Sequence, residues 1–460
     1  TLAGQDFGER EHLLLALVAP YLLLAVARSL GRDVRPGPAV LIGLLAGSAF
    51  GLKPHFVLLW VAVEGYLRLT RRVHWGALLP ETLAIAGFLA SYLLATVLWA
   101  PGYLRLVQLL AGQYTRFLYV PFWQLLVRGP WALFTMCALL AYGALRRYAK
   151  YPPLVDLFAF GTLVCLVAGA AQQKGFSYHF YPSFGLATIV LGLLALDRGA
   201  PLQNWVGAVF RVIAISMLAT VGTIACVRNV ATAIRPTRDT EQAQMELLLP
   251  VVRDRAAGER VYVMSYNISS AYPLINYAGA HSASRFAQLW ILAAAYMDQL
   301  KGSRPLRYHA TGEMSPSERY MNQAVLEDLR QQRPKLLAIL QHARDLPANG
   351  FRRLDYLAYF SRDPRIATIL EGYQLVANVG DFVVYERVAE GAARSGPPPT
   401  VQPGTRDVIQ AGQASGTGGR VGHPETLLAL AAFVISAIIA LLTERGKQTR
   451  RPGHGAPAPS

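Results

Sequence analysis

Long apolar stretches fill the first half of the chain, and short polar connections separate them. A helix needs about 20 apolar residues to cross a bilayer, although shorter ones can cross where the bilayer thins or flanking side chains snorkel. The pattern predicts nine spans, of which the second and the seventh are short. These spans cover residues 13–28, 37–52, 55–69, 82–100, 130–146, 154–171, 182–196, 208–227 and 425–443.

Between the eighth and ninth spans, residues 228–388 have the composition of a soluble domain with alternating strand and helix patterns. The expected elements are strands at Val261–Met264 and Lys335–Leu340, helices around 269–278 and over 316–331 with Ser315 or Ser317 as cap, and a hairpin of Tyr373–Ala377 with Phe382–Tyr385. A small α/β domain follows from this rhythm. Residues 389–423 are rich in Gly, Pro, Ser and Thr, which predicts a flexible linker to a last membrane helix at 424–444. Residues 445–460 are expected to form a cytoplasmic tail.

Composition agrees with a polytopic membrane protein. Hydrophobic residues make up 53% of the 460 residues and charged residues 16%, whereas soluble domains carry about 25% charged residues. The formal net charge of +16 could indicate nucleic-acid binding, but no basic groove with stacked aromatics accompanies it. Cys137, Cys165 and Cys226 fall inside apolar spans without metal-ligand spacing, so we interpret them as small hydrophobic residues.

Lysine and arginine divide unevenly between the two sets of connections. One set holds fifteen and the short connections of the other set hold six. Because basic residues collect in cytoplasmic loops, the richer set is predicted to be cytoplasmic. The opposite, periplasmic side then receives residues 1–12, 53–55, 101–129 and 172–181 together with the α/β domain. Since the chain begins with Thr1 at a membrane edge, we expect it to be the C-terminal part of a longer protein.

The first candidate site is the segment Asp6-Phe7-Gly8-Glu9-Arg10-Glu11-His12, directly before the first span. If a helix begins near Asp6, then Asp6, Glu9 and Arg10 share one face, and Glu9 approaches His12. Such a group could bind a divalent metal through Asp6, Glu9 and His12, act as a general base, or bind sugar hydroxyls. The alternative is structural: Asp6 caps the helix with Glu9 as its capping-box partner, while Arg10 and His12 anchor it.

The second candidate is Lys174-Gly175-Phe176-Ser177-Tyr178-His179-Phe180-Tyr181-Pro182, between the sixth and seventh spans. A lysine, a histidine and two tyrosines at a membrane surface suit a lipid-linked phosphate, because they combine positive charge with hydrogen-bond donors. An aromatic belt at the membrane interface is the alternative. That alternative explains the tyrosines but not Lys174 on the less basic side.

Two weaker candidates lie on the same side. Lys53-Pro54-His55 forms a rigid turn that could present Lys53 and His55 to a phosphate, or could be a plain turn with a snorkelling lysine. The loop 101–129 alternates aromatic and arginine residues, which predicts one or two interfacial helices. These helices could border a lipid-substrate groove or simply anchor the loop. Glu64, inside the third span, is interpreted as structural.

With outer-face acidic and basic motifs, interfacial helices and a C-terminal extramembrane domain, the chain resembles the polytopic GT-C glycosyltransferases over most of residues 1–388. This family includes protein O-mannosyltransferases, the transferases that add aminoarabinose to lipid A, and mycobacterial arabinosyltransferases. The motifs that carry the resemblance are Asp6 to His12 and Lys174 to Pro182.

The resemblance implies an inverting transfer of a sugar from a polyprenyl-phosphate donor to a glycan, lipid or protein acceptor at the bacterial plasma membrane. The main catalytic base of the family lies in a first outer loop, which is expected upstream of Thr1. Asp6, Glu9, Glu11 and His12 then match a second acidic group, which sometimes holds Mg, Mn or Ca. The expected substrate-binding residues are Arg10, Lys53, His55, Lys174, Tyr178, His179 and Tyr181.

The alternative from another class is a non-catalytic scaffold or flippase-like subunit of a cell-surface polysaccharide machine. A transporter would need polar residues at mid-membrane, and the spans carry few.

Overall fold

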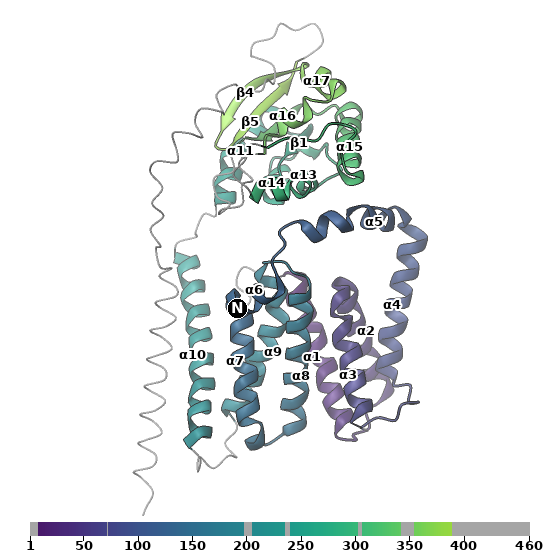
Figure 1. The fold of residues 1–460 in the computed structure, drawn as a ribbon, viewed down its shortest axis with the longest axis vertical. Coiled ribbons are helices and arrows are strands. Elements are labelled where there is room, and N and C mark those ends of the chain that lie inside the picture. The colour runs from purple at the N-terminus through teal and green to yellow at the C-terminus, as the bar shows by residue number, and fades with distance from the viewer. Residues whose placement is uncertain are drawn as a thin grey trace, which may run out of the picture. The chain divides into compact units, whose positions relative to one another are not determined.

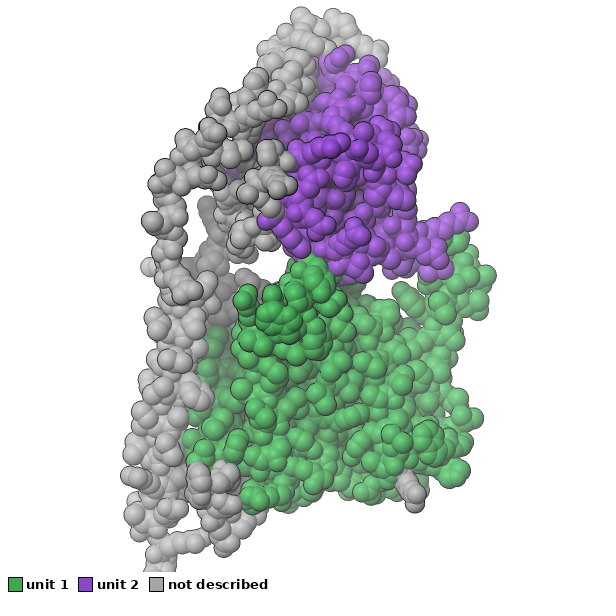
Figure 2. Space-filling model, viewed as in Figure 1, with its two compact units in different colours: residues 1–101, 119–236, 419–460 green, residues 102–118, 237–418 purple. Residues whose placement is uncertain are grey.

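The computed structural model describes residues 8–70, 72–196, 205–234, 240–301, 306–341 and 354–388. Asp6, the linker 389–423, the expected ninth span and the tail lie outside these ranges. The chain divides into two compact units (Figure 2). The first contains residues 1–101, 119–236 and 419–460, and the second contains residues 102–118 and 237–418.

The first unit is a bundle of apolar helices (Figure 1). Proline stands at the first or second position of α2, α4, α7 and α8, where its fixed φ and missing N–H cost nothing. Short 3-10 turns η2 (Pro54–Phe56), η3 (Arg146–Tyr148) and η4 (Ser177–Phe180) join neighbouring helices. The helices are α1 (Arg10–Ser29), α2 (Pro36–Leu52), α3 (Val57–Leu69), α4 (Pro80–Trp99), α6 (Phe122–Arg128), α7 (Pro130–Leu145), α8 (Pro152–Ala171), α9 (Tyr181–Leu196) and α10 (Trp205–Ile234).

Helices stand at all eight expected spans that fall within the described residues, but fewer qualify as membrane-crossing. Five are long and apolar enough: α1, α4, α8, residues 177–195 around α9, and residues 208–227 of α10. A sixth results if α6 and α7, bent by 76° against each other, count as one span. With 13 residues, α3 rises only about 20 Å, less than the roughly 30 Å hydrocarbon core. At 17 and 13 residues, α2 and α3 are shorter than these helices, so the count of nine spans stays a prediction.

Small residues let α2 approach α4 closely. A Cβ on Gly43 would lie 2.5 Å from the Glu81 backbone oxygen, so no larger residue fits there without moving a backbone. Ala39, Gly43, Ala46 and Gly47 are all buried on this side of α2. Close contact through small residues is a common way for membrane helices to associate, because lipid tails are as apolar as the side chains they compete with.

Ion pairs tie the helices together at one end of the bundle. Arg28, at the end of α1, forms a two-pronged pair with Glu81 at the start of α4, at 2.9 and 3.1 Å. Glu64 of α3 pairs with Arg68 and also accepts hydrogen bonds from Tyr21 at 3.2 Å and Thr82 at 2.7 Å. The structural interpretation of Glu64 is therefore confirmed. Several arginines that the sequence assigned to one side of the membrane do meet at one end.

The second unit is an α/β domain built on a five-stranded sheet of order β2-β1-β3-β5-β4. The pairs β1–β2 and β1–β3 are parallel, while β3–β5 and β4–β5 are antiparallel. Every residue of β3 is buried, as expected for a central strand covered on both faces. The strands are β1 (Arg260–Met264), β2 (His281–Ser282), β3 (Leu336–Leu340), β4 (Tyr373–Val379) and β5 (Phe382–Arg387).

The predicted strands and hairpin of this domain are confirmed, with the turn shortened to Gly380-Asp381. Ser315 caps α15 by accepting a hydrogen bond from the Glu318 N–H, as one of the two expected alternatives. The single helix expected around 269–278 was wrong, because two short elements, η5 and α12, replace it. The remaining helical elements are α5 (Pro101–Arg116), α11 (Thr240–Ala256), η5 (Ile268–Ser270), α12 (Leu274–Tyr277), α13 (Trp290–Ala295), α14 (Met297–Lys301), α15 (Pro316–Gln332), α16 (Tyr356–Phe360) and α17 (Pro364–Leu370).

The loop 101–129 is divided between the two units. It forms two helices, and residues 102–118, which comprise α5 after Pro101 and the two residues that follow it, group with the α/β domain. Gln113 donates a hydrogen bond to the Ser315 hydroxyl at 3.2 Å, and the ring of Phe117 contacts that of Trp290. Residues 119–236 belong to the helix bundle, where α6 packs on α7 and α8.

Candidate functional site

Three connections at the other end of the bundle bring most of the predicted site residues together. They are the first turn of α1, the α2–α3 connection through η2, and the α8–α9 connection through η4. Direct contacts link all three: Glu11 of α1 contacts Lys53 before η2, and His179 of η4. Segments more than 100 residues apart in sequence thus form one cluster. The sequence expectation that these motifs share one side of the bundle is confirmed in this sense.

The centre of the cluster is a buried carboxylate. Glu11 is fully buried, and its Oε1 lies 2.5 Å from Nζ of Lys53, which is itself only 9% exposed. Glu11 Oε2 has no hydrogen-bond donor among the described residues. Removing two opposite charges from water is costly, and their attraction compensates only at such short range. The pair therefore fixes the position of the Lys53 ammonium group at the end of α2.

His179 approaches the same carboxylate oxygen of Glu11 as Lys53 does. Its Nε2 is 3.9 Å from Glu11 Oε1, and its Nδ1 is buried without a hydrogen-bond partner in the described part of the chain. A glycine in α8 allows this position, because a Cβ on Gly169 would lie 2.6 Å from the His179 carbonyl oxygen. The close approach of η4 to α8 thus brings the His179 ring to the buried carboxylate.

Lys174 is the second buried cation of the cluster, with 2% exposure. Its segment is fixed by antiparallel pairing with the chain after α5: Tyr119 bridges Lys174, and the Val120 N–H donates to the Gln173 carbonyl at 2.9 Å. Burial lowers the pKa of Lys174, because its charged form loses hydration. Lys174 stands five residues before His179, on the same connection that carries η4, and so belongs to this end of the bundle.

Aromatic rings surround this charged centre. The Lys53 ammonium group lies 5.5 Å from the centre of the Tyr178 ring, and Tyr178 meets the His179 ring edge-on at 4.6 Å. Tyr181 contacts His12 in the same manner at 5.5 Å. The remaining predicted histidine, His55, lies within η2 and is half-buried. Its Nε2 has no hydrogen-bond partner among the described residues.

The opening motif is arranged differently from the expectation. The helix begins at Arg10 and not near Asp6, so Glu9 occupies the N-cap position without a side-chain cap. Glu9 and Arg10 are exposed, whereas Glu11 points into the bundle. The capping-box alternative was therefore wrong for Glu9, because Glu9 stands at the N-cap position itself and not in the first turn of the helix. Of the acidic residues predicted in this motif, Glu11 is the one that joins the cluster.

The expected metal site finds no support among the described residues. No three His, Cys, Asp or Glu side chains gather closely enough there to share an ion. Glu9 is exposed, His12 contacts Tyr181, and Glu11 is held by Lys53. Because Asp6 lies outside the described ranges, a metal at Asp6, Glu9 and His12 stays a prediction, and we derive no chemical step from it.

The arrangement suits an anionic ligand that also carries hydroxyl groups. Buried polar atoms normally have hydrogen-bond partners, and exceptions call for an explanation such as an absent ligand. Here Glu11 and His179, which face each other, both have unsatisfied atoms, and so do His55 and Gln172 on the neighbouring connections. Because Glu11 neutralises Lys53, the buried ammonium group of Lys174 is the one that favours an anion at this end. Phosphate and sugar hydroxyls together would supply the missing partners.

A second polar network, which the sequence did not indicate, lies in the α/β domain. Fully buried Glu318 accepts hydrogen bonds from Tyr296 at 2.7 Å and Tyr359 at 3.0 Å. His309 Nδ1 lies 2.8 Å from its other oxygen. In the sequence, the one feature that marked Glu318 was its spacing from Ser315, which is typical of a capping box and not of a buried network. In the fold the Glu318 carboxylate turns to the tyrosines and His309, and this explains how a buried charge is tolerated.

Comparison with protein-family models, with curated proteins and with solved structures finds no match for this chain.

Proposed function

We propose that this chain is a membrane-embedded glycosyltransferase that moves a sugar, with inversion, from a polyprenyl-phosphate donor to a periplasmic or lipid-linked acceptor. One observation carries the proposal: two buried lysines and several unsatisfied buried polar atoms meet at one end of a bundle of apolar helices. A polyprenyl chain would lie among the apolar helices, and its phosphate would reach the charged cluster at their end.

In this mechanism the lysines act on the leaving group. The acceptor hydroxyl gives its proton to the catalytic base that the family resemblance implies, and its oxygen forms a bond to the anomeric carbon. The bond from that carbon to the phosphate oxygen breaks, and polyprenyl phosphate leaves with one additional negative charge. Lys174 and Lys53 stabilise the charge as it develops, which is where fixed electrostatics lower a barrier most. Both are held in place before the reaction, Lys53 by Glu11 and Lys174 by the pairing of its segment with Tyr119.

The other residues of the site receive roles by position. Glu11 holds Lys53 at 2.5 Å and so orients a cation. Tyr178, Tyr181 and His179 line the same cluster and can donate hydrogen bonds to phosphate or sugar. Exposed Glu9 and Arg10, at the mouth of the cluster, are assigned to the acceptor. We assign this end of the bundle and the α/β domain to the periplasmic side of a bacterial plasma membrane, an assignment that the asymmetry of basic residues supports.

The experiment uses the full-length protein in proteoliposomes with a panel of polyprenyl-phosphate donors carrying mannose, arabinose or aminoarabinose. Release of polyprenyl phosphate and the anomeric configuration of the product are measured. Lys174→Met keeps the volume of the side chain and removes the charge, so the rate should fall by roughly 100- to 1000-fold. Lys150→Met, at the opposite end of the bundle, is the matched control and should keep the rate of the unmodified protein.

Unchanged turnover in a folded Lys174→Met variant would contradict the phosphate role. Folding is checked separately by size-exclusion chromatography, since Lys174 is buried. Retention of configuration in the product would contradict an inverting mechanism.

One observation favours a second candidate, a non-catalytic subunit of a polysaccharide machine. Glu11 and Lys53 neutralise each other in a buried pair, which is also how a purely structural link between α1 and the end of α2 would look. A scaffold should not release polyprenyl phosphate from any of the donors. It should still bind its partner when it carries Lys174→Met. Donor turnover by the purified protein would exclude this candidate.

A further inference from the structure

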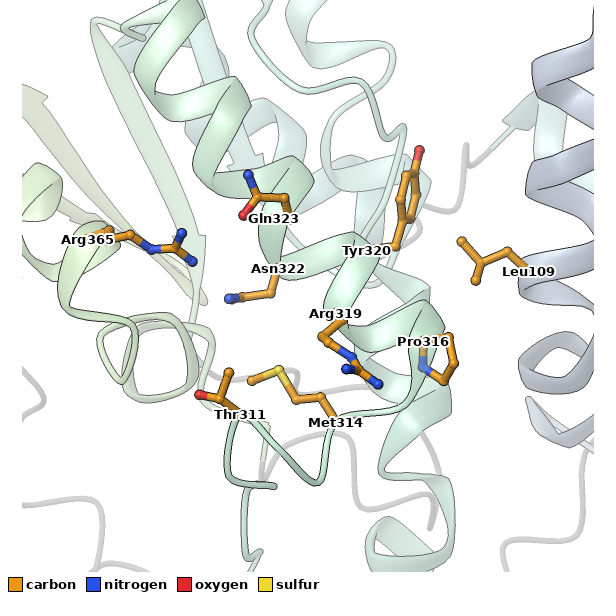
Figure 3. Close-up of a pocket in the computed structure, with 9 residues that line it drawn as sticks. All are labelled: Leu109, Thr311, Met314, Pro316, Arg319, Tyr320, Asn322, Gln323 and Arg365. Carbon is orange, nitrogen blue, oxygen red and sulfur yellow. The ribbon is translucent and has the colours of Figure 1, made fainter.

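A pocket in the α/β domain lies apart from the helix-end cluster in sequence and in chemistry. It has a volume of about 440 Å³ and is lined by residues of α5, α15 and α17 and of the segment before α15. This size falls within the range of small-molecule sites, about 300–1,000 Å³. Figure 3 shows side chains of α15 in its centre, with Arg365 approaching from α17 and Leu109 standing on α5.

The cation at the centre of the pocket is Arg319. Its side chain is exposed, and no carboxylate pairs with it in the part of the chain that the structure describes. It stands near the N-terminal end of α15, the end at which the helix dipole disfavours positive charge. Arg319 therefore forms no ion pair with a described carboxylate and does not stabilise its own helix through the helix dipole. An anionic group of a ligand would satisfy both the guanidinium and the helix end.

A second guanidinium is held rigidly on the other side. Arg365 binds Asp363 through two parallel hydrogen bonds of 3.0 and 2.8 Å. Asn322 donates to the same carboxylate at 3.1 Å. Asp363 thus holds Arg365 and Asn322 in position before a ligand binds. Because Asp363 also neutralises the charge of Arg365, this arginine is suited to donate hydrogen bonds to neutral oxygen atoms. A carboxylate that fixes an arginine in this manner lowers the entropy lost when a ligand binds.

The remaining walls combine polar and apolar surface. Tyr320 offers a ring face and a hydroxyl, and Gln323 supplies an amide whose nitrogen donates to Glu327 at 3.1 Å. Asn322 and Gln323 therefore each keep an oxygen for accepting hydrogen bonds. Leu109 closes one side, on a helix that Gln113 ties to Ser315. Hydroxyl-rich rings with apolar faces match such a mixture better than a purely apolar ligand does.

We propose that this pocket binds a sugar residue that carries one anionic group, a carboxylate or a phosphate, with Arg319 on the anion and Asn322, Gln323 and Arg365 on the hydroxyls. The pocket makes this inference independent of the transferase activity. Were both correct, the pocket would be a subsite for an acidic acceptor glycan.

The test measures binding alone, without any lipid donor. Glucuronate, glucose 6-phosphate and glucose are titrated onto the full-length protein in nanodiscs, and saturation-transfer NMR reports the dissociation constants. At least one acidic sugar should bind about tenfold or more tightly than glucose, because a hydrogen bond to a charged group is involved. Arg319→Gln should reduce the acidic sugar to the affinity of glucose.

The matched control is Arg330→Gln, an exposed arginine on the same helix that lines a different pocket. It should leave the affinity unchanged. Equal binding of acidic and neutral sugars, no saturable binding of either acidic sugar, unchanged binding in Arg319→Gln, or an equal loss in Arg330→Gln would each overturn the proposal. Because no donor or turnover enters the measurement, its failure would leave the proposed transferase reaction standing, and the reverse also holds.

Discussion

Replacing Lys53 by Met should destabilise the helix bundle strongly, because it leaves the Glu11 carboxylate buried without its cation. Glu11 is fully buried and lies 2.5 Å from Lys53 Nζ. At an effective dielectric constant of about 20 the attraction over this distance is about 7 kcal/mol. Desolvation of both ions consumes most of it, so the net contribution of the pair is small. Loss of one partner alone costs about 3–5 kcal/mol.

The double variant Glu11→Gln with Lys53→Met separates the two contributions. It contains no buried charge at this position, so most of the lost stability should return. Apparent midpoints of thermal unfolding in detergent, followed by size-exclusion chromatography, should fall by roughly 10 °C in the single variant and by much less in the double variant.

The same pair of variants also tests the role of Lys53 in catalysis. If Lys53 acts on phosphate, the double variant should be folded but slow in releasing polyprenyl phosphate. A single Lys53→Met variant as stable as the unmodified protein would refute the assignment of a buried, mutually dependent pair. A double variant as unstable as the single variant would refute the electrostatic explanation of the loss.

Two further predictions concern local structure. Gly169→Ala should lower the free energy of unfolding by about 1–3 kcal/mol and slow turnover, because the new Cβ would lie 2.6 Å from the His179 carbonyl oxygen. The control Gly143→Ala has open space around its Cβ and should instead raise the unfolding midpoint slightly. Equal effects of the two substitutions would contradict the proposed packing. Arg365 lowers the pKa of Asp363, so this carboxylate adds stability above the ordinary aspartate pKa of about 3.9, and that stability is lost as the pH falls through the lowered value. Asp363→Asn should therefore reduce stability at pH 7 and flatten its decline in acid, and an unchanged pH profile of the unfolding midpoint would count against this coupling.

Much of the architecture was predictable from the chain itself. The apolar stretches located the described membrane helices, and the strand pattern located β1, β3 and the β4–β5 hairpin. Burial produces such a pattern in each segment whichever other segment covers it. The short elements η5 and α12 were not predictable as such, since only a few residues support each.

The candidate site shows the same division. Charge asymmetry between connections placed Glu11, Lys53 and Lys174 on one side, since sidedness follows from the order of spans along the chain. The residue at which the helix begins decides which of the three carboxylates in the opening motif points into the bundle. With the helix starting at Arg10, Glu11 turns inward and Glu9 outward, and neither composition nor spacing contains that start.

The order of apolar and polar residues along the chain was enough to predict a bundle of apolar helices with an α/β domain, and to predict that the motifs rich in charge share one side. The contacts of Glu11 with Lys53 and His179, the packing of α5 with the α/β domain and the place of Arg319 in a pocket came from the folded structure. The reason is physical. Burial leaves its pattern in each local segment, whereas an ion pair or a pocket depends on the distance between segments that only packing brings together.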